Sequence, residues 1–563
     1  MAPVPNLYPP SYAPLGVAVA HLSLVVYLSY AVGTSLYTSY KALSPSQHTR
    51  QRQSRRVELV PVFVGLAATA LALAAYSTVR YAALSYRVWA DHRGYALPQR
   101  YVHFGYIQEN DLLTSLFTPR VFGNEGLLPS PNNSSDLYLA HWLSDTPVYF
   151  DAFEIIAEKS RRFWWGQQID LATVAWSMLL AIEGRRRRIP MLPAFMALAH
   201  LVNLSYAQNL FYLALLLTPA PIPSGENDLK LPVAPASVWS KLHNYFFPPK
   251  PNNWCPHPVV FLTGMAVNLA AIGLLPHAAE TPSFVKVAMT ARLATFLPLL
   301  LPKVVPNSWG TVHPHPHNAY SSFTSLFRFL SAASVFLHAK ATFYGLSYNL
   351  PNSHYHRHSR FLPWDVEERS AWERGSSSAG KVLGSISDHP VVAAVGWDAL
   401  ICAVSLGVWA AVRATDVQAI IKSTVPYYGT EITEALSSEE ATSDDKMIKI
   451  KPEDDESPEP ESYMSKQSGR TRGRLASIAS SSGLSDDVAA STPRRRGQAN
   501  RQLAEEEKAY EPTTQEAREI VEGDILPPEE LDWESASLSW GLAALGGLGC
   551  ACAGVFGGES ISR

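Results

Sequence analysis

The segment from Asp151 to Arg188 reads DAFEIIAEKSRRFWWGQQIDLATVAWSMLLAIEGRRRR. An acidic stretch runs into an apolar stretch, and the segment ends in four consecutive arginines. At about 100° per residue, a single helix over this segment would place carboxylates, an amide and indoles on one face. The residues of this stripe are Asp151, Glu154, Glu158, Arg161, Trp165, Gln168, Ala172, Trp176 and Glu183.

The apolar part of the segment, residues 163–182, is long enough to cross a bilayer as a helix. Charged side chains in that setting are costly and usually face a protein interior or a wet cavity. Two interpretations follow. Either the stripe lines a polar, aromatic-rich pocket, or it is an interfacial helix end in which Glu158 pairs with Arg161 and Arg162 beside a belt of Trp residues.

The chain of 563 residues contains two kinds of sequence. Up to about residue 415 it consists mostly of long apolar blocks, whereas residues 423–533 are polar, charged and nearly free of aromatics. Such a tail offers little apolar surface to offset the entropy of ordering, so we expect disorder there. The 4 cysteines show no CxxC spacing and imply no disulfide framework.

We predict an all-α fold, a polytopic transmembrane helix bundle of about eight spans, because backbone polar groups in hydrocarbon must bond within their own segment. The expected spans are residues 15–36, 60–81, 163–182, 190–217, 259–275, 285–301, 323–346 and 391–412. A ninth apolar block at 536–555 is Gly-rich and weaker. The first block lacks a basic start and a cleavage pattern, so we expect it to be retained as a signal anchor.

These spans and the tail predict five regions. They are the first two helices with a basic cytoplasmic loop (1–86), a lumenal segment (87–162), the main bundle (163–415), the disordered tail (416–534) and a weak C-terminal apolar segment (535–563).

Basic loops indicate which side of the membrane is cytoplasmic. The loop after the first span is rich in arginine, and the third span ends in residues 185–188, so both are expected in the cytoplasm. The segment between them is then lumenal, and its overlapping sequons predict glycosylation of Asn132 or Asn133. We therefore expect a multi-pass protein of the endoplasmic reticulum or another endomembrane.

Eight spans would place the tail in the lumen. The tail contains RGRLAS at 472–477 and PRRR at 493–496, which resemble cytoplasmic kinase-site and basic-patch features. Either one span is miscounted, or these features carry no topological meaning.

Polar residues inside the predicted spans are candidates for a site. In the fourth span His200, Asn203 and Tyr206 share one side, where they either cross-link helices by hydrogen bonds or line a pocket. In the seventh span, His338 and Lys340 are difficult to explain as boundary residues.

Asp398 lies beside Trp397, about two turns inside the eighth span. A lone carboxylate at that depth needs a cation or a hydrogen-bond partner, for which Arg328, His338 and His200 are candidates.

No metal or other cofactor is expected. Two His-rich loops, at 313–317 and 354–358, offer alternating ligands that zinc or copper can use. Their spacing does not match the helical histidine boxes of membrane di-iron desaturases. The chain also lacks a Gly-rich nucleotide motif, a GxSxG elbow and an HExxH motif, which argues against ATP-driven transport, serine hydrolysis and zinc proteolysis. The basic segments are interpreted as topology determinants, so no nucleic-acid partner is expected.

The segment DTPVYFDAFEIIAEKSRRFWWGQQIDLATVAWSMLLAIEGRRRRIP is followed by HLVNLSYAQNLFYLALLLTP and later by DHPVVAAVGWDAL. Together they resemble polytopic membrane proteins of filamentous fungi that occur with secondary-metabolite enzymes. They are similar to the group that includes the membrane terpene cyclases of ascochlorin and ascofuranone biosynthesis. The resemblance covers roughly residues 145–413 and rests on overall pattern, without a diagnostic short motif.

The resemblance implies an enzyme of meroterpenoid metabolism that cyclises a prenylated, lipid-soluble substrate, often an epoxide. A carboxylic acid would protonate the substrate, and aromatic faces would stabilise the carbocation. The resemblance supplies no catalytic residues, so the candidates come from the physical interpretation of the sequence. The candidate acids are Asp398, Glu154, Glu158 and Asp151. The candidate substrate-binding residues are Trp164, Trp165, Gln168, Trp176, His200, Asn203 and Trp397.

The alternative is a non-enzymatic multi-pass membrane protein, either a transporter or a scaffold with a regulatory tail. A repeated pair of broken helices would favour a transporter, and the sequence does not reveal one. Metal transport through the His-rich loops is a third possibility. The oligomeric state is left open.

Overall fold

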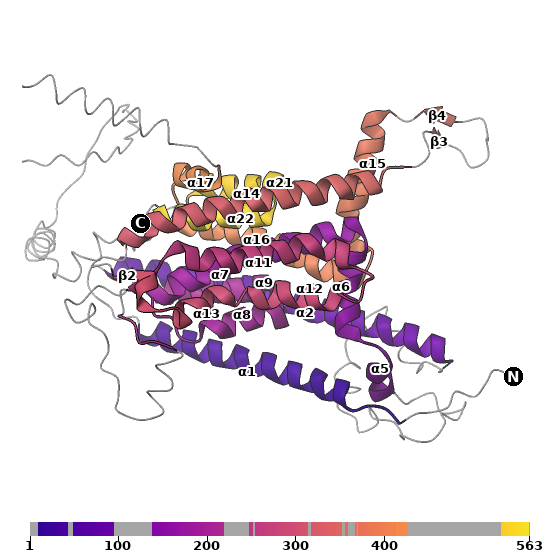
Figure 1. The fold of residues 1–563 in the computed structure, drawn as a ribbon, viewed down its shortest axis with the longest axis horizontal. Helices are drawn as coiled ribbons and strands as arrows, with labels where there is room; N and C mark the ends of the chain where they lie inside the picture. The colour runs from indigo at the N-terminus through magenta and orange to yellow at the C-terminus, as the bar shows by residue number, and fades with distance from the viewer. Residues whose placement is uncertain are drawn as a thin grey trace, which may run out of the picture. The chain divides into compact units, whose positions relative to one another are not determined.

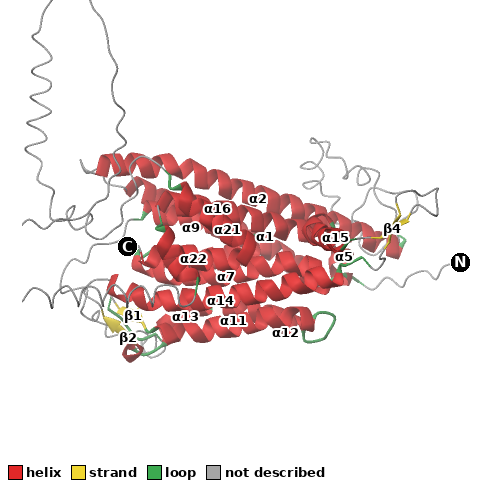
Figure 2. Ribbon diagram, turned by 90° about the horizontal axis from the view of Figure 1, so that it is seen from above, coloured by secondary structure: helices red, strands yellow, loops and turns green. Residues whose placement is uncertain are grey.

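The computed structural model describes residues 9–42, 49–94, 138–218, 247–251, 254–312, 317–351, 355–357, 366–368, 370–413, 415–425 and 531–561. All of them belong to one compact unit, residues 1–428 and 514–563. Helices dominate it, as predicted, and pack side by side (Figure 2). Two short antiparallel strand pairs join β1 (Trp254–Pro256) to β2 (Gly310–Val312) and β3 (Tyr355–Arg357) to β4 (Val366–Glu368).

Long helices run between two ends of this unit (Figure 1). They are α1 (Ala13–Ala42), α2 (Thr49–Arg93), α7 (Ser160–Arg186), α11 (Pro258–Ala278), α14 (His317–Tyr348), α16 (Pro390–Arg413) and the bent pair α12 (Phe284–Ala294) and α13 (Leu297–Val304). The shorter helices are α5 (Leu139–Asp145), α6 (Val148–Glu158), α8 (Leu192–Leu201), α9 (Leu204–Leu217), α15 (Ala371–Gly384), α17 (Val417–Thr424), α21 (Trp533–Gly546) and α22 (Leu548–Ile561), with 3-10 turns η4 (Asn307–Trp309) and η5 (Ser385–Ser387).

We define the two ends of the unit by the two ends of α7. The α6 end is where α6 meets the start of α7, and the arginine end is where α7 finishes, at Arg185 and Arg186. In Figure 1 the α6 end is on the right and the arginine end on the left.

Four of the described helices are long and apolar enough to cross a membrane: Ala13–Ala42, Arg56–Arg93, Pro258–Ala278 and Pro390–Arg413. The α12–α13 pair, bent by 62°, would make a fifth. The more polar α7 and α14 have 27 and 32 residues, and a helix of that length exceeds the roughly 30 Å of a bilayer core. The membrane character of the fold is supported, whereas eight separate spans are not confirmed.

The predicted fourth span, residues 190–217, is a hairpin of two short helices. α8 begins at the arginine end, where Leu192 packs on Gly184. α9 returns to that end, where Arg187 Nη1 donates to the carbonyl oxygens of Leu215 at 3.1 Å and Thr218 at 2.8 Å. The prediction of one crossing helix is wrong because the backbone turns between α8 and α9. Asn203 is extended there, and its side chain accepts the N–H of Tyr206 as an N-cap.

The predicted ninth block is a second hairpin, made of α21 and α22. The turn is at Gly547, whose φ of +82° is readily available only to glycine. Asp532 N–H, just before α21, donates to Ala411 O near the arginine end, and near the end of α22 Glu559 pairs with Arg413. We call these two elements the α8–α9 hairpin and the α21–α22 hairpin. Both enter and leave at the arginine end.

α22 belongs to the core, although the sequence ranked its segment as weak. It packs against α7, α14 and α17, and its glycines allow a close approach. A Cβ added at Gly549 would lie 2.5 Å from Leu171 Cβ, and one at Gly557 would lie 2.7 Å from Ser423 Cβ. Small residues at helix contacts are the usual means of tight packing in membranes.

The predicted single helix over residues 151–188 is two helices. Lys159 is extended, with φ −114° and ψ 128°, and separates α6 from α7. The carboxylates of Asp151, Glu154 and Glu158 therefore do not continue onto the face of α7 that holds Gln168. Ion pairs from the start of α7 to Asp388 stabilise this break between the two helices.

Candidate functional site

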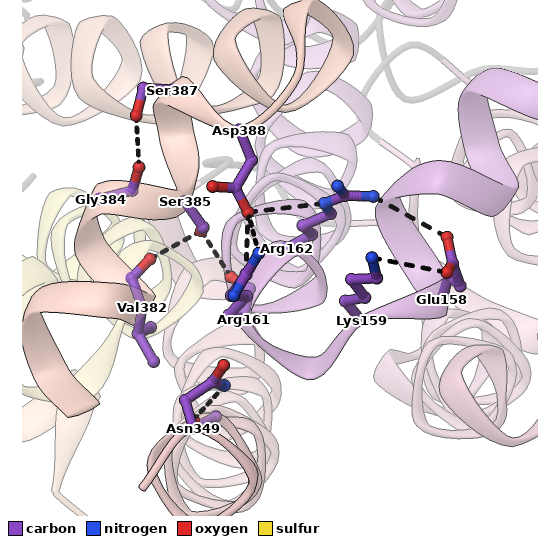
Figure 3. A network of polar contacts seen from close by, with 11 residues as sticks. Glu158, Lys159, Arg161, Arg162, Asn349, Val382, Gly384, Ser385, Ser387 and Asp388 are labelled. Atoms are coloured by element: carbon purple, nitrogen blue, oxygen red, sulfur yellow. Dashed lines mark hydrogen bonds and ion pairs between the residues drawn. The ribbon is translucent and has the colours of Figure 1, made fainter. Parts of the chain in front are cut away.

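The α6–α7 junction is held by ion pairs (Figure 3). Arg161 turns away from Glu158 and bonds Asp388 at 2.8 Å, and Ser385 Oγ donates to the Arg161 carbonyl at 2.9 Å. Arg162 lies between Glu158 at 3.8 Å and Asp388 at 3.7 Å. The expected Glu158–Arg162 pair is confirmed, and the expected Glu158–Arg161 pair is replaced by a pair that ties α7 to the start of α16.

The other carboxylates of α6, Glu154 and Asp151, lie about one and two helical turns before Glu158. Burial, and then the negative charge of Glu154, raise the pKa of Asp151 above its usual range.

Asp398 is 5% exposed and is bonded to the α8–α9 hairpin. Its two carboxylate oxygens accept the backbone N–H groups of Leu204 at 3.1 Å and Ser205 at 2.8 Å. The partner that the sequence required is therefore the N-terminus of α9, where a negative charge is favoured. Two cavities among the described residues are lined in part by α6, and Asp398 lines neither of them, so the structure does not bring Asp398 together with the acidic residues of α6.

Gln168 accepts a backbone N–H of the α21–α22 hairpin, as Asp398 does for the α8–α9 hairpin. Its Oε1 accepts the N–H of Leu548, the first residue of α22, at 3.1 Å. Asn203 caps α9 and donates to the Ala70 carbonyl at 3.1 Å. His200 bonds Thr295 at 2.7 Å, beside the bend between α12 and α13. These three predicted binding residues therefore hold helices together.

The predicted tryptophans are dispersed. Trp164 donates to Thr342 Oγ1 at 2.9 Å and lies edge-on to Trp165, with ring centroids 4.9 Å apart. Trp176 is fully buried in the core. Trp397 is 46% exposed on the outer face of α16. The four rings do not form one aromatic wall.

The arginines after the third predicted span are not a simple solvated loop. Arg187 is 2% exposed and pairs with Glu183 at 3.3 Å. Nearby, Glu559 bonds Trp409 Nε1 at 3.1 Å and Arg413 Nε at 3.2 Å. Glu559 was not among the residues expected from the sequence, although a carboxylate so close to an apolar block indicates a buried polar contact.

A cavity of about 360 Å³ opens at the α6 end between α6, α7, α11 and α14. That volume is within the usual range for small-molecule sites. Its apolar wall includes Phe163, Leu337, Tyr344 and Tyr348. We call it the α6–α14 cavity.

Polar groups converge on this cavity from four helices. Glu158 is the carboxylate among its described lining residues, and Lys340 Nζ lies 3.4 Å from His277 Nε2 across α11 and α14. Gln167, 2% exposed, also lines it, and its buried Oε1 has no hydrogen-bond partner among the described residues. A buried amide oxygen left open in this way needs water or a ligand. Of these residues, Glu158 and Lys340 were candidates on the sequence alone, whereas Gln167 and His277 were not.

Several predicted features lie outside the described residues. These are the sequon residues Asn132 and Asn133, residues 313–316, 354 and 358 of the two His-rich loops, and residues 426–530 of the tail. The prediction of disorder is wrong for residues 417–424 of the tail, which form the helix α17 and pack against α22. Within the described part of the chain, no group of three or more His, Cys, Asp or Glu side chains could hold a metal ion.

Comparisons of the chain with protein-family models, with curated proteins and with solved structures found no match.

Proposed function

We propose that the protein binds an amphipathic, lipid-soluble molecule in the α6–α14 cavity and catalyses its acid-initiated cyclisation. The observation that carries this proposal is the combination, in one cavity, of an aromatic wall with a carboxylate, a Lys–His pair and an open amide oxygen. The resemblance to membrane terpene cyclases supplies the reaction class.

Access from the membrane supports a lipid-soluble substrate. Next to the cavity, α14 exposes Phe343 at 67% and Tyr348 at 76%. An exposed Tyr ring near the end of a membrane helix is typical of the interface between lipid and water, and an exposed Phe ring is suited to the hydrocarbon. A prenylated molecule can therefore enter sideways, with its apolar chain along α14 and its polar end toward Lys340 and His277.

Glu158 is the proposed proton donor, and in the substrate complex it carries a proton in place of the ion pairs with Arg162 and Lys159 that it makes in this structure. In the cyclisation of a terminal epoxide, its proton goes to the epoxide oxygen, the C–O bond breaks, and a C=C electron pair closes the ring. The faces of Phe163, Tyr344 and Tyr348 stabilise the positive charge that moves along the chain. A carbon next to the final cation then gives a proton to the Glu158 carboxylate, and the electron pair of that C–H bond forms a new C=C bond. The reaction is an isomerisation that needs no oxidant or metal. Gln167 and the Lys340–His277 pair hold the polar end of the substrate.

The test uses protein in lipid nanodiscs supplied with prenylated epoxides, with products of unchanged mass separated by chromatography. Glu158→Gln removes the proton and should lower kcat by about 10²–10⁴-fold. Its partners lie at 3.8 and 3.9 Å near the surface, so their loss should cost little stability. Glu154→Gln is the matched control, because Glu154 does not line the cavity. Full activity of Glu158→Gln would remove it as the acid.

The two hairpins favour a second candidate, a transporter, because half-helices that begin inside a bundle often border transport sites. Against this, Asp398 and Gln168 already bond the N-termini of α9 and α22. Uptake of a candidate substrate into sealed proteoliposomes without chemical conversion would support transport.

We also propose seven crossings, made by α1, α2, α7, α11, the α12–α13 pair, α14 and α16. The α8–α9 hairpin does not cross, so every later helix reverses relative to the eight-span prediction. α17 and the start of α21 then lie on the same side as the basic loop before Arg56. This arrangement removes the conflict between the tail and the basic loops, and it places the tail in the cytoplasm of an endomembrane protein. Accessibility of cysteines introduced into residues 472–477 in sealed microsomes tests it.

A further inference from the structure

A second cavity, of about 530 Å³, lies at the arginine end. It is bounded by the end of α7, the start of α8, α13 and residues 247–250. Three of its lining residues are cationic, namely Arg185, Lys250 and Lys303, and Leu192, Phe247 and Leu299 contribute apolar walls. No carboxylate is among the described residues that line it.

Two of these cations are fixed in place. Lys250 Nζ lies 4.3 Å from the centroid of the Trp254 ring, and the Arg185 guanidinium carbon lies 5.5 Å from it. Lys250 Nζ also donates to the carbonyl oxygen of Pro302. Arg185 Nη1 is buried and has no hydrogen-bond partner among the described residues. A buried guanidinium N–H group without an acceptor can donate a hydrogen bond to an anion in the cavity.

The like charges oppose each other. Burial, and then the positive charge of Arg185, lower the pKa of Lys250 to about 8. An anion placed between the two side chains would offset this repulsion.

The cavity borders the outward face of α13. Leu300 and Val304 on this helix are 44% and 52% exposed, and Phe247 at the cavity itself is 41% exposed. In a bilayer this apolar surface faces acyl chains, so a lipid can place its head group among the cations and its chains along α13. Basic pockets at the ends of membrane helices are suited to anionic head groups.

We propose that this cavity binds the phosphate head group of an anionic phospholipid. The site is separate from the α6–α14 cavity, because it lies at the opposite end of α7. The proposal does not depend on the cyclase function.

The test measures binding of short-chain phosphatidylglycerol and phosphatidylcholine to the detergent-purified full chain by native mass spectrometry. Phosphatidylglycerol should bind about tenfold tighter or more, and Lys250→Met and Lys303→Met should each weaken its binding about fivefold. Lys303 is exposed, so its replacement should leave the fold intact even if Lys250→Met does not. The control is Lys286→Met, which removes an exposed lysine of α12 away from the cavity.

Equal binding of the two lipids would overturn the proposal, as would an equal loss in Lys286→Met. Inorganic phosphate added as a competitor distinguishes a lipid head group from a soluble phosphate ion as the natural ligand. Displacement of the lipid by phosphate at matched concentration would assign the site to a soluble anion and reject the lipid. Failure of phosphate to displace it would support the head group with its attached chains.

Discussion

Replacing Asp398 by Asn tests whether this buried carboxylate is structural. The amide keeps one acceptor oxygen for Leu204 or Ser205 and turns an NH₂ group toward the other backbone N–H. A hydrogen bond to a charged group contributes about 1.5–3 kcal/mol, whereas side-chain bonds between membrane helices average about 0.6 kcal/mol. Because Asp398 is 5% exposed and accepts bonds at 2.8 and 3.1 Å, we expect a loss of about 2 kcal/mol.

The assay is thermal unfolding in detergent, followed as loss of the monodisperse size-exclusion peak. Asp398→Asn should lower the midpoint by several degrees. Asp416→Asn is the matched control, since Asp416 also accepts two N–H bonds at a helix start, at 3.2 and 3.3 Å, but is exposed. A stable Asp398→Asn protein that binds substrate and fails to cyclise it would refute the structural role and restore Asp398 as the acid.

Three further outcomes are expected. Gly549→Val should prevent the α21–α22 hairpin from packing, because even a Cβ at this position lies 2.5 Å from Leu171 Cβ; limited proteolysis of that hairpin measures it. Phosphatidylglycerol binding should weaken as the pH rises through about 8, because Lys250 loses its proton and with it its positive charge. The phosphodiester of the lipid keeps its negative charge over this pH range. An affinity that does not change with pH would contradict the assignment. Endoglycosidase treatment should shift the mobility of the protein made in a eukaryotic cell, and the shift should vanish when Asn132 and Asn133 both become Gln.

Hydropathy predicted where helices occur but not how all of them are placed. α11 and α16 match their expected spans within three residues, and the longer α1 and α2 contain theirs, because each of these spans lies in one apolar helix. A hairpin of two short helices satisfies its backbone hydrogen bonds internally just as one long helix does, so composition cannot distinguish them. The turn before α9 depends on Asp398, which is nearly two hundred residues away in the sequence.

Some residues of the candidate site were predictable from the sequence, but their contacts were not. The sequence indicated that Asp398 needed a partner, but it offered cationic side chains, and the partner is a pair of backbone N–H groups. Glu158 was a candidate because of a helical repeat that Lys159 interrupts. Gln167 and His277 meet Glu158 through the packing of separate helices, and periodicity within any one helix carries no information on that meeting.

The α21–α22 hairpin makes residues 426–530 a tether instead of a free end. Both anchors of this tether, α17 and α21, lie at the arginine end, and α22 fills the space between α7 and α14. If the tether is as disordered as its composition predicts, doubling its length would cost only about 0.6 kcal/mol of loop-closure entropy. Its length is therefore nearly free to vary, whereas cutting it would turn the closing of the bundle from an intramolecular step into a bimolecular one.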